Sequence, residues 1–156
     1  MMSIDQEVEI LRQIPLFANI EPARLKLMAF ASERLTYKPG QSLFHQGDVG
    51  DAAYIIVDGT ADVIIETPDG PLKVAVLERN DIVGEIAILC DVPRTATVTA
   101  ATELTTLMVT KELFFRMLMD FPVMGVEIMR VLAHRLEVTT AQLTEVQKQV
   151  REQAKK

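Results

Sequence analysis

The sequence contains few of the residues on which metal sites and disulfide frameworks depend. Cys90 is the only cysteine among 156 residues, so no internal disulfide can form and an iron–sulfur cluster would lack ligands. The two histidines, His45 and His134, lie in different predicted elements, and no His-x-His pattern brings ligands together. We therefore expect a cytoplasmic protein without a metal or a resident cofactor.

Positive charge and long apolar runs are also scarce. Lys and Arg total 16 against 22 Asp and Glu, which gives a formal net charge of −6. Because nucleic acid is bound through a basic face, we expect no nucleic-acid partner. No apolar run approaches the roughly 20 residues that span a bilayer, and the acidic, amphipathic N-terminus does not resemble a signal peptide. We expect no membrane partner either.

The apolar residues that are present change their spacing twice along the chain. Hydrophobic residues make up 49% of the sequence, which is enough for one packed domain. Their spacing is helical over residues 1–34, strand-like with closely spaced turns over 35–110, and helical again over 111–156. This order predicts an α+β, mainly β, fold: an antiparallel β-jelly-roll barrel flanked by N-terminal helices and a long C-terminal helix.

Glycine and proline mark the predicted turns. Asp58-Gly59 separates two β-rich runs and is a strong hairpin signal, and Thr67–Gly70 predicts a second turn. Near the C-terminus, a short amphipathic helix begins at Lys111 and is expected to end at Pro122.

The last segment predicts one long helix with two apolar strips. A heptad strip has alternating spacings of three and four residues and comprises Met129, Leu132, Leu136, Thr139, Leu143, Val146 and Val150. A shorter strip comprises Met124, Ile128, Val131 and Val138. Two strips require two neighbours, so we expect the short strip to contact the barrel and the heptad strip to form a homodimer. The tail from about residue 147 is polar and is expected to fray.

The most distinctive stretch is VGEIAILCDVPRTATV, residues 83–98. Gly84 before a short helical turn allows backbone amides to face an anion, and Arg94 supplies planar paired donors suited to a phosphate. Glu85 can accept hydrogen bonds from sugar hydroxyls. Taken alone, the same residues favour a surface ion pair across a loop, because short motifs often match by chance.

The surrounding sequence favours the ligand-binding interpretation. GEIAIL and PRTATV resemble the phosphate-binding cassette of the cyclic nucleotide-binding domain family, and KPGQSLFHQGDVGDAAYIIVDGTADV resembles its opening strands and turns. AHRLEVTTAQL is similar to the ligand-capping, dimer-forming helix of the bacterial catabolite activators. The resemblance covers about residues 17–143. It implies that residues 1–156 form a single cyclic nucleotide-binding domain, with cAMP favoured and cGMP possible as ligand.

The resemblance also implies roles for individual residues of the cassette. Gly84 and the amides of Ile86 and Ala87 would face the cyclic phosphate. Glu85 would accept the ribose 2′-hydroxyl, and Arg94 would pair with the phosphate charge.

Further residues would contact the rest of the ligand. Thr95 follows the arginine and would reach phosphate or purine. Three residues would line the base and sugar: Val63, Val74 and Ala75. Three residues of the long helix would meet the ligand: Arg135, Thr139 and Thr140. Thr95 is compatible with guanine and the threonine pair with adenine, so the choice of purine stays open. Thr139 in the heptad strip is equally compatible with a register-setting role.

Other functions receive less support. The sequence shows no nucleophile–base–orienter set, so we do not expect an enzyme. Cys90 is expected to be a small buried or half-buried hydrophobe rather than a nucleophile. A ligand-free scaffold or a small enzyme on the same barrel is the alternative. No recognition helix follows the long helix, so we expect signalling to an unidentified downstream protein or output domain rather than direct transcription control.

Overall fold

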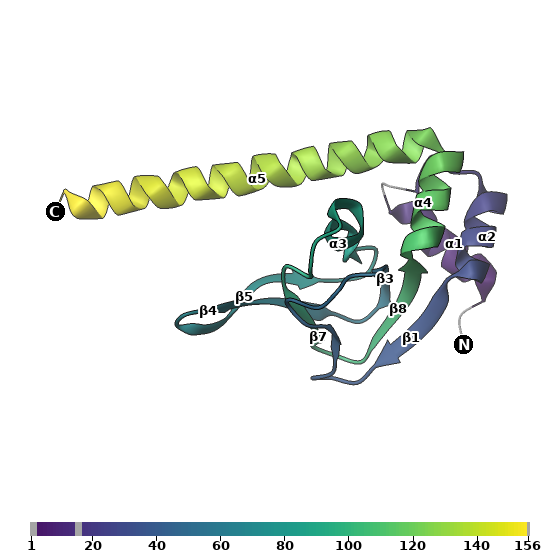
Figure 1. Ribbon diagram of the computed structural model, residues 1–156, viewed down its shortest axis with the longest axis horizontal. Helices are drawn as coiled ribbons and strands as arrows, with labels where there is room; N and C mark the ends of the chain where they lie inside the picture. The colour runs from purple at the N-terminus through teal and green to yellow at the C-terminus, as the bar shows by residue number, and fades with distance from the viewer. Residues whose placement is uncertain (1–2, 15–16, 156) are drawn as a thin grey trace.

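Two four-stranded antiparallel sheets form the centre of the molecule, with helices gathered at one end and one long helix passing over them (Figure 1). The computed structural model describes residues 3–14 and 17–155, with the side chain of Ile86 outside that description. The predicted helical segments 1–34 and 111–156 include residues 1–2, 15–16 and 156, which lie outside the described residues. The helices are α1 (Ile4–Gln13), α2 (Pro22–Ala31), α3 (Glu85–Cys90), α4 (Lys111–Asp120) and α5 (Pro122–Ala154). The strands are β1 (Glu33–Tyr37), β2 (Ser42–Phe44), β3 (Ala52–Asp58), β4 (Ala61–Thr67), β5 (Gly70–Leu77), β6 (Ile82–Val83), β7 (Thr97–Ala100) and β8 (Leu104–Thr110).

The strand order confirms the predicted fold class. One sheet has the order β1-β8-β3-β6 and the other β2-β7-β4-β5, so most neighbours are distant in sequence, as in a jelly roll. The first strand begins at Glu33, slightly before the predicted start at Leu35.

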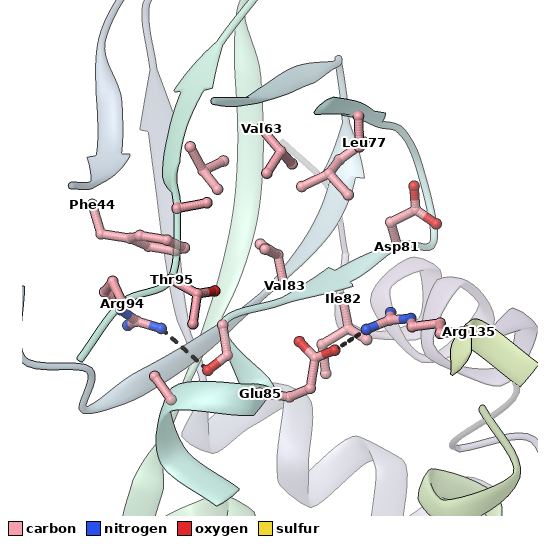
Figure 2. A pocket seen from close by; sticks show the side chains of 15 residues that line it. Phe44, Val63, Leu77, Asp81, Ile82, Val83, Glu85, Arg94, Thr95 and Arg135 are labelled. Atoms are coloured by element: carbon pink, nitrogen blue, oxygen red, sulfur yellow. Dashed lines mark hydrogen bonds and ion pairs between the residues drawn. The ribbon is translucent and has the colours of Figure 1, made fainter. Parts of the chain in front are cut away.

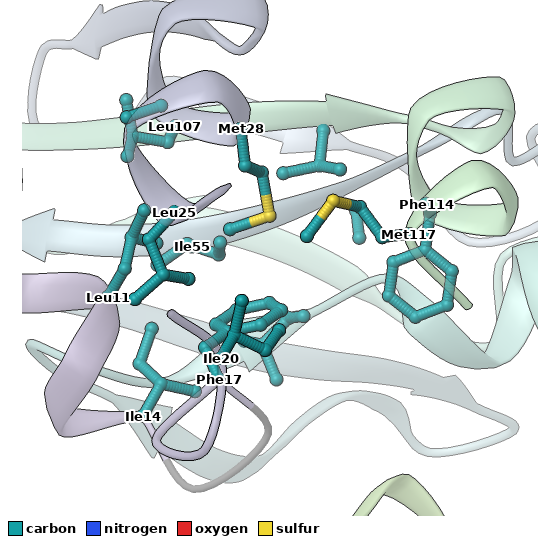
Figure 3. Close-up of a cluster of buried hydrophobic side chains, with 14 of the residues drawn as sticks. Leu11, Ile14, Phe17, Ile20, Leu25, Met28, Ile55, Leu107, Phe114 and Met117 are labelled. Atoms are coloured by element: carbon teal, nitrogen blue, oxygen red, sulfur yellow. The ribbon is translucent and has the colours of Figure 1, made fainter. Parts of the chain in front are cut away.

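The N-terminal helices and α4 cover the outer face of the first sheet. Ser3 caps α1 through a reciprocal pair of hydrogen bonds with Gln6, and Glu7 of α1 forms an ion pair with Arg34 of β1. Figure 3 shows the buried cluster between these layers. The labelled side chains are Leu11, Ile14, Phe17, Ile20, Leu25, Met28, Ile55, Leu107, Phe114 and Met117.

Strand β3 separates this helical core from the interior of the barrel. Its residues Ala52–Val57 are all buried, because alternate side chains of a strand point to opposite faces and both faces are covered. Ala53, Ile55 and Val57 belong to the buried cluster under the helices. Ala52, Tyr54 and Ile56 pack inside the barrel. Strand β3 therefore separates the cluster under the helices from the interior of the barrel.

The prediction of a hairpin at Asp58-Gly59 is wrong. Strands β3 and β4 belong to different sheets, and the connection between them carries the chain from one sheet to the other. The backbone after Gly59 pairs with the turn before β8, where the Ala101 amide donates to the Thr60 carbonyl at 3.0 Å. The left-handed conformation of Gly59 (φ +90°) is thus used for a crossover. The Thr67–Gly70 turn does form a hairpin, between β4 and β5.

Helix α5 has a packed beginning and an exposed remainder. Its first turn starts at Pro122, which ends α4 as predicted. Met124 and Ile128 are buried, whereas every residue from Ala133 to Ala154 is exposed. The polar tail from about residue 147 is helical in the structure, since α5 continues to Ala154, and its fraying stays a prediction. Across the described ranges, no helix has the length and apolar character needed to cross a membrane.

Candidate ligand-binding pocket

A pocket of about 400 Å³ lies inside the barrel, between the second sheet and α3, and reaches α5 (Figure 2). Arg94, Thr95 and Glu85 lie towards α3, whereas most of the apolar lining residues come from the strands and Asp81 lies beside Leu77. The lining comprises Phe44, Val63, Ala75, Leu77, Asp81, Ile82, Val83, Gly84, Glu85, Ala87, Arg94, Thr95, Ala96, Val98 and Arg135. The structure therefore brings together most of the residues that the sequence nominated.

Gly84 turns the chain from β6 into α3. Its φ of +92° lies in the left-handed region, which favours glycine. A Cβ atom there would lie 2.5 Å from Nη1 of Arg94 and 3.0 Å from the Ala52 carbonyl oxygen. Only glycine allows this close approach. Because the first amides of a helix lack intrahelical acceptors, the amides of the opening residues of α3, which include Ile86 and Ala87, remain available to an acceptor outside the helix.

Arg94 is a buried cation without a carboxylate in contact. The residue is 4% exposed. Its Nη1 donates to the Gly84 carbonyl at 3.1 Å and its Nη2 to the Ala52 carbonyl at 2.7 Å. In the part of the chain that the structure describes, no carboxylate oxygen forms an ion pair with this guanidinium, and Nε is buried without a hydrogen-bond partner. The guanidinium has more N–H donors than these two bonds use, so it retains capacity for an anion.

Burial shifts the pKa of Arg94 and that of the neighbouring Tyr54. Desolvation lowers the pKa of Arg94, and interactions with Tyr54, Asp51, Asp48 and Glu85 oppose that shift. Burial also raises the pKa of Tyr54, while the Arg94 charge lowers it. Tyr54 is therefore neutral at pH 7, and the site keeps its positive charge.

Glu85 occupies the same pocket but has an ionic partner. It is 4% exposed and forms an ion pair with Arg135, which reaches down from α5 and is half-exposed (Figure 2). The pair joins the first residue of α3 to the long helix. The acid and the base of the cassette are thus separate groups that both face the pocket.

The opposite wall is apolar and accounts for two of the three predicted base-contacting residues. Val63 and Ala75 face each other across β4 and β5 and line the pocket, as does Thr95. Val74 does not, and its side chain is 47% exposed. Ala75 and Leu77 line the pocket from alternate positions of β5, so the adjacent Val74 points to the opposite face. The register also shifts there, with Val63 opposite Ala75 but Ile64 opposite Lys73, which makes Val74 the extra residue of a bulge.

The two predicted threonines of α5 lie away from the pocket of their own subunit. Thr139 and Thr140 are exposed and are not among its lining residues. They follow Arg135 by about one helical turn, along the part of α5 that leaves the barrel. Of this group, only Arg135 lines the pocket.

Several lining residues were not nominated from the sequence. Phe44, Leu77 and Val83 come from short or edge strands whose inward face is not evident from spacing alone. Val98 of β7 and Ala96, which precedes that strand, line the pocket as well. Asp81 also lines the pocket. Its Oδ2 accepts a hydrogen bond from the Glu78 amide at 2.8 Å, so the residue stabilises the turn between β5 and β6.

The remaining candidate groups do not form a second site. Cys90 ends α3 and is exposed, so the expectation of a buried or half-buried residue is wrong. Among the described residues, no three histidine, cysteine or acidic side chains are grouped as a metal would require.

The comparisons agree with this geometry. The chain is 27% identical over 139 residues to a CRP-like cAMP-activated global transcriptional regulator of Mycobacterium tuberculosis, covering 88% of this chain and 62% of that protein. It is 38% identical over 108 residues to a cAMP-dependent protein kinase regulatory subunit of Mucor circinelloides f. lusitanicus, covering 69% of this chain and 25% of that one. The catabolite activator protein of Thermus thermophilus superposes with a TM-score of 0.78 at 25% identity, covering 85% of this chain and 62% of that one.

The chain therefore spans less than two thirds of these relatives. The family model described as the cyclic nucleotide-binding domain matches residues 34–121, which is more than half of the chain. This match includes the two sheets, α3 and the cassette. The chain belongs to the cyclic nucleotide-binding domain family.

Proposed function

We propose that this protein is a cytoplasmic receptor for a purine 3′,5′-cyclic nucleotide, with cAMP preferred over cGMP. The observation that carries the proposal is Arg94, a buried guanidinium with spare donors and no ionic partner among the described residues, at one end of a largely apolar pocket. A volume of about 400 Å³ is within the range of small-molecule sites. The single cysteine, Cys90, suits a reducing compartment.

The pocket offers a complementary group to each part of such a ligand. The cyclic phosphate carries one negative charge and would lie against Arg94, Gly84 and the first amides of α3. The ribose 2′-hydroxyl would donate to Glu85. The purine would extend along the apolar wall that includes Val63 and Ala75, with Thr95 near its edge.

The ion pair between Glu85 and Arg135 supplies a route from ligand to helix. A ribose hydroxyl that donates to Glu85 would compete with Arg135 for the same carboxylate. Because Arg135 is on α5, a change in this contact alters the most stable position of the helix against the barrel. Ligand would then shift the population towards one arrangement of α5. A downstream protein or output domain would read that arrangement.

The exposed heptad strip supports a homodimer through α5. Leu136 is 68% exposed and Leu143 56%, and both lie on the part of the helix that no other described element covers. Leu132 already packs against the helical core, so the pairing surface lies mainly beyond it. Large apolar side chains at heptad spacing are stabilised when a second helix covers them.

Parallel calorimetric titrations test the proposed ligand. Protein freed of carried-over nucleotide should bind cAMP with micromolar or tighter affinity, cGMP more weakly, and 5′-AMP little. The last ligand is the control, because it has the same purine and ribose but a dianionic, open phosphate. If neither cyclic nucleotide binds, the proposal fails and a ligand-free scaffold becomes the better account.

A further inference from the structure

The guanidinium of Arg94 lies against the face of an aromatic ring. Its Cζ is 4.0 Å from the centroid of Phe44 and 5.9 Å from that of Tyr54. The two ring centroids are 5.8 Å apart, with their planes tilted by 37°. Both aromatic residues are 8% exposed, so the contact is largely shielded from water. A cation over an aromatic face is attracted most strongly when both are desolvated.

Backbone groups confine the same guanidinium elsewhere. The carbonyls of Gly84 and Ala52 accept its two hydrogen bonds. On a further side lies Gly50, where a Cβ atom would come 3.1 Å from Cζ of Arg94 and 2.4 Å from Cβ of Ala87. The two carbonyl groups hold Nη1 and Nη2 of Arg94. They do not by themselves prevent the planar guanidinium from tilting about the line between these atoms.

A local irregularity directs Phe44 to this position. Strand β2 pairs with β7 through Ser42 opposite Thr99 and Phe44 opposite Val98, so β2 contains one extra residue between these pairs. Such a bulge changes the direction in which a side chain points. Phe44 consequently packs with the interior cluster of the barrel, beside Tyr54 and Val98.

We propose that Phe44 is a positioning residue for ligand binding, whose ring face holds the Arg94 guanidinium in the plane that receives the anion. The ligand role rests on the proposed function, whereas the positioning is a property of the protein alone. With the plane fixed in advance, ligand binding does not have to immobilise a flexible side chain. Ordering one such side chain on binding weakens affinity by roughly three- to tenfold.

The positioning is tested by the NMR signal of the Arg94 Nε–H group, assigned with the Arg94→Lys variant. In the wild type, the ring current of Phe44 should move this proton upfield of the other arginine Nε–H signals. Phe44→Leu, which keeps apolar volume but removes the ring, should abolish that displacement. Phe44→Tyr keeps the ring and should retain it. Because the wild-type signal is informative by itself, failure of Phe44→Leu to fold would not prevent the test.

The consequence for binding is tested by cAMP titration of the same folded variants. Phe44→Leu should bind roughly three- to tenfold more weakly than wild type, Phe44→Tyr should match wild type, and Phe44→Leu should have no further effect in an Arg94→Gln background. A wild-type Nε–H signal without a ring-current shift overturns the inference. An unchanged affinity of Phe44→Leu overturns it while leaving the proposed function intact. If the wild type binds no cyclic nucleotide, the proposed function fails and the Nε–H signal alone decides whether Phe44 positions Arg94.

Discussion

Arg94 and Glu85, two of the charged residues of the pocket, are held in opposite ways. Arg94, at the phosphate end, is stabilised by carbonyl oxygens and a ring face and has no carboxylate in contact within the described ranges. Glu85, at the helix end, is paired with Arg135 of a helix that otherwise leaves the barrel. A cation without an ionic partner attracts a ligand anion. An acid that already has an ionic partner can exchange that partner for a ligand group. On the proposed function, this difference predicts that affinity depends mainly on the Arg94 end of the pocket and signalling on the α5 end.

The largest expected effect comes from removing the cation. Arg94→Ala should weaken cAMP binding by roughly two to four decades, because loss of one partner of a buried charge pair costs about 3–5 kcal/mol. Calorimetry on the variant measures this, with circular dichroism to establish that it is folded. A folded variant that binds like wild type would show that the cassette assignment is wrong.

Removing the acid should have a smaller effect. Glu85→Ala should weaken cAMP binding by about ten- to a hundredfold, because a hydrogen bond to a charged group contributes roughly 1.5–3 kcal/mol. Glu85→Gln keeps an acceptor oxygen and serves as the matched control, with an intermediate affinity. If Glu85→Ala lost as much cAMP affinity as Arg94→Ala, the Arg94 and Glu85 ends of the pocket would not differ in their contribution to affinity.

The heptad threonine should have a still smaller effect on affinity. If Thr139 of one subunit meets the ligand of its partner, Thr139→Val should weaken binding by about two- to tenfold, since one neutral hydrogen bond is lost, and should keep or strengthen the dimer. Sedimentation and titration, with Thr140→Val for comparison, measure both. Unchanged affinity would make Thr139 a register residue only, and a monomer at all concentrations would refute the heptad pairing.

Arg135 should affect signalling more than affinity. Arg135→Ala should change the cAMP dissociation constant by less than about fivefold, because the Arg135 side chain is half-exposed and solvent screens its attraction to the buried Glu85 to roughly 0–1 kcal/mol. It should abolish the ligand-dependent change in hydrogen exchange along α5. Arg130→Ala is the matched control, since Arg130 pairs with Glu127 on the same helix. A variant that keeps the wild-type exchange response would exclude Arg135 from the route to the helix.

The sequence predicted the features that depend on local chemistry. The division into helices, barrel and helices follows from the spacing of apolar residues, and the cassette residues Gly84, Glu85 and Arg94 do lie at one pocket. These predictions required only that a short segment keep its own conformation.

The features that could not be predicted depend on pairing between distant segments. The Asp58-Gly59 turn has hairpin chemistry, yet its flanking strands pair with β8 and β7 rather than with each other. Which face of β5 lines the pocket depends on how that strand pairs with β4, and this pairing places Ala75 inward and Val74 outward. The ion pair of Glu85 with Arg135 joins residues fifty positions apart in sequence and depends on where α5 crosses the barrel.

The most direct test of the account observes Arg94 itself during binding. Isotope-labelled protein would be titrated with cAMP while the guanidinium N–H signals of Arg94 are followed by NMR, and adenosine, which lacks the phosphate, would be titrated in parallel. The account predicts that cAMP moves these signals, with the same dissociation constant as calorimetry, and that adenosine leaves them in place. Binding of cAMP that leaves the Arg94 signals unchanged would contradict the claim that this buried cation receives the cyclic phosphate.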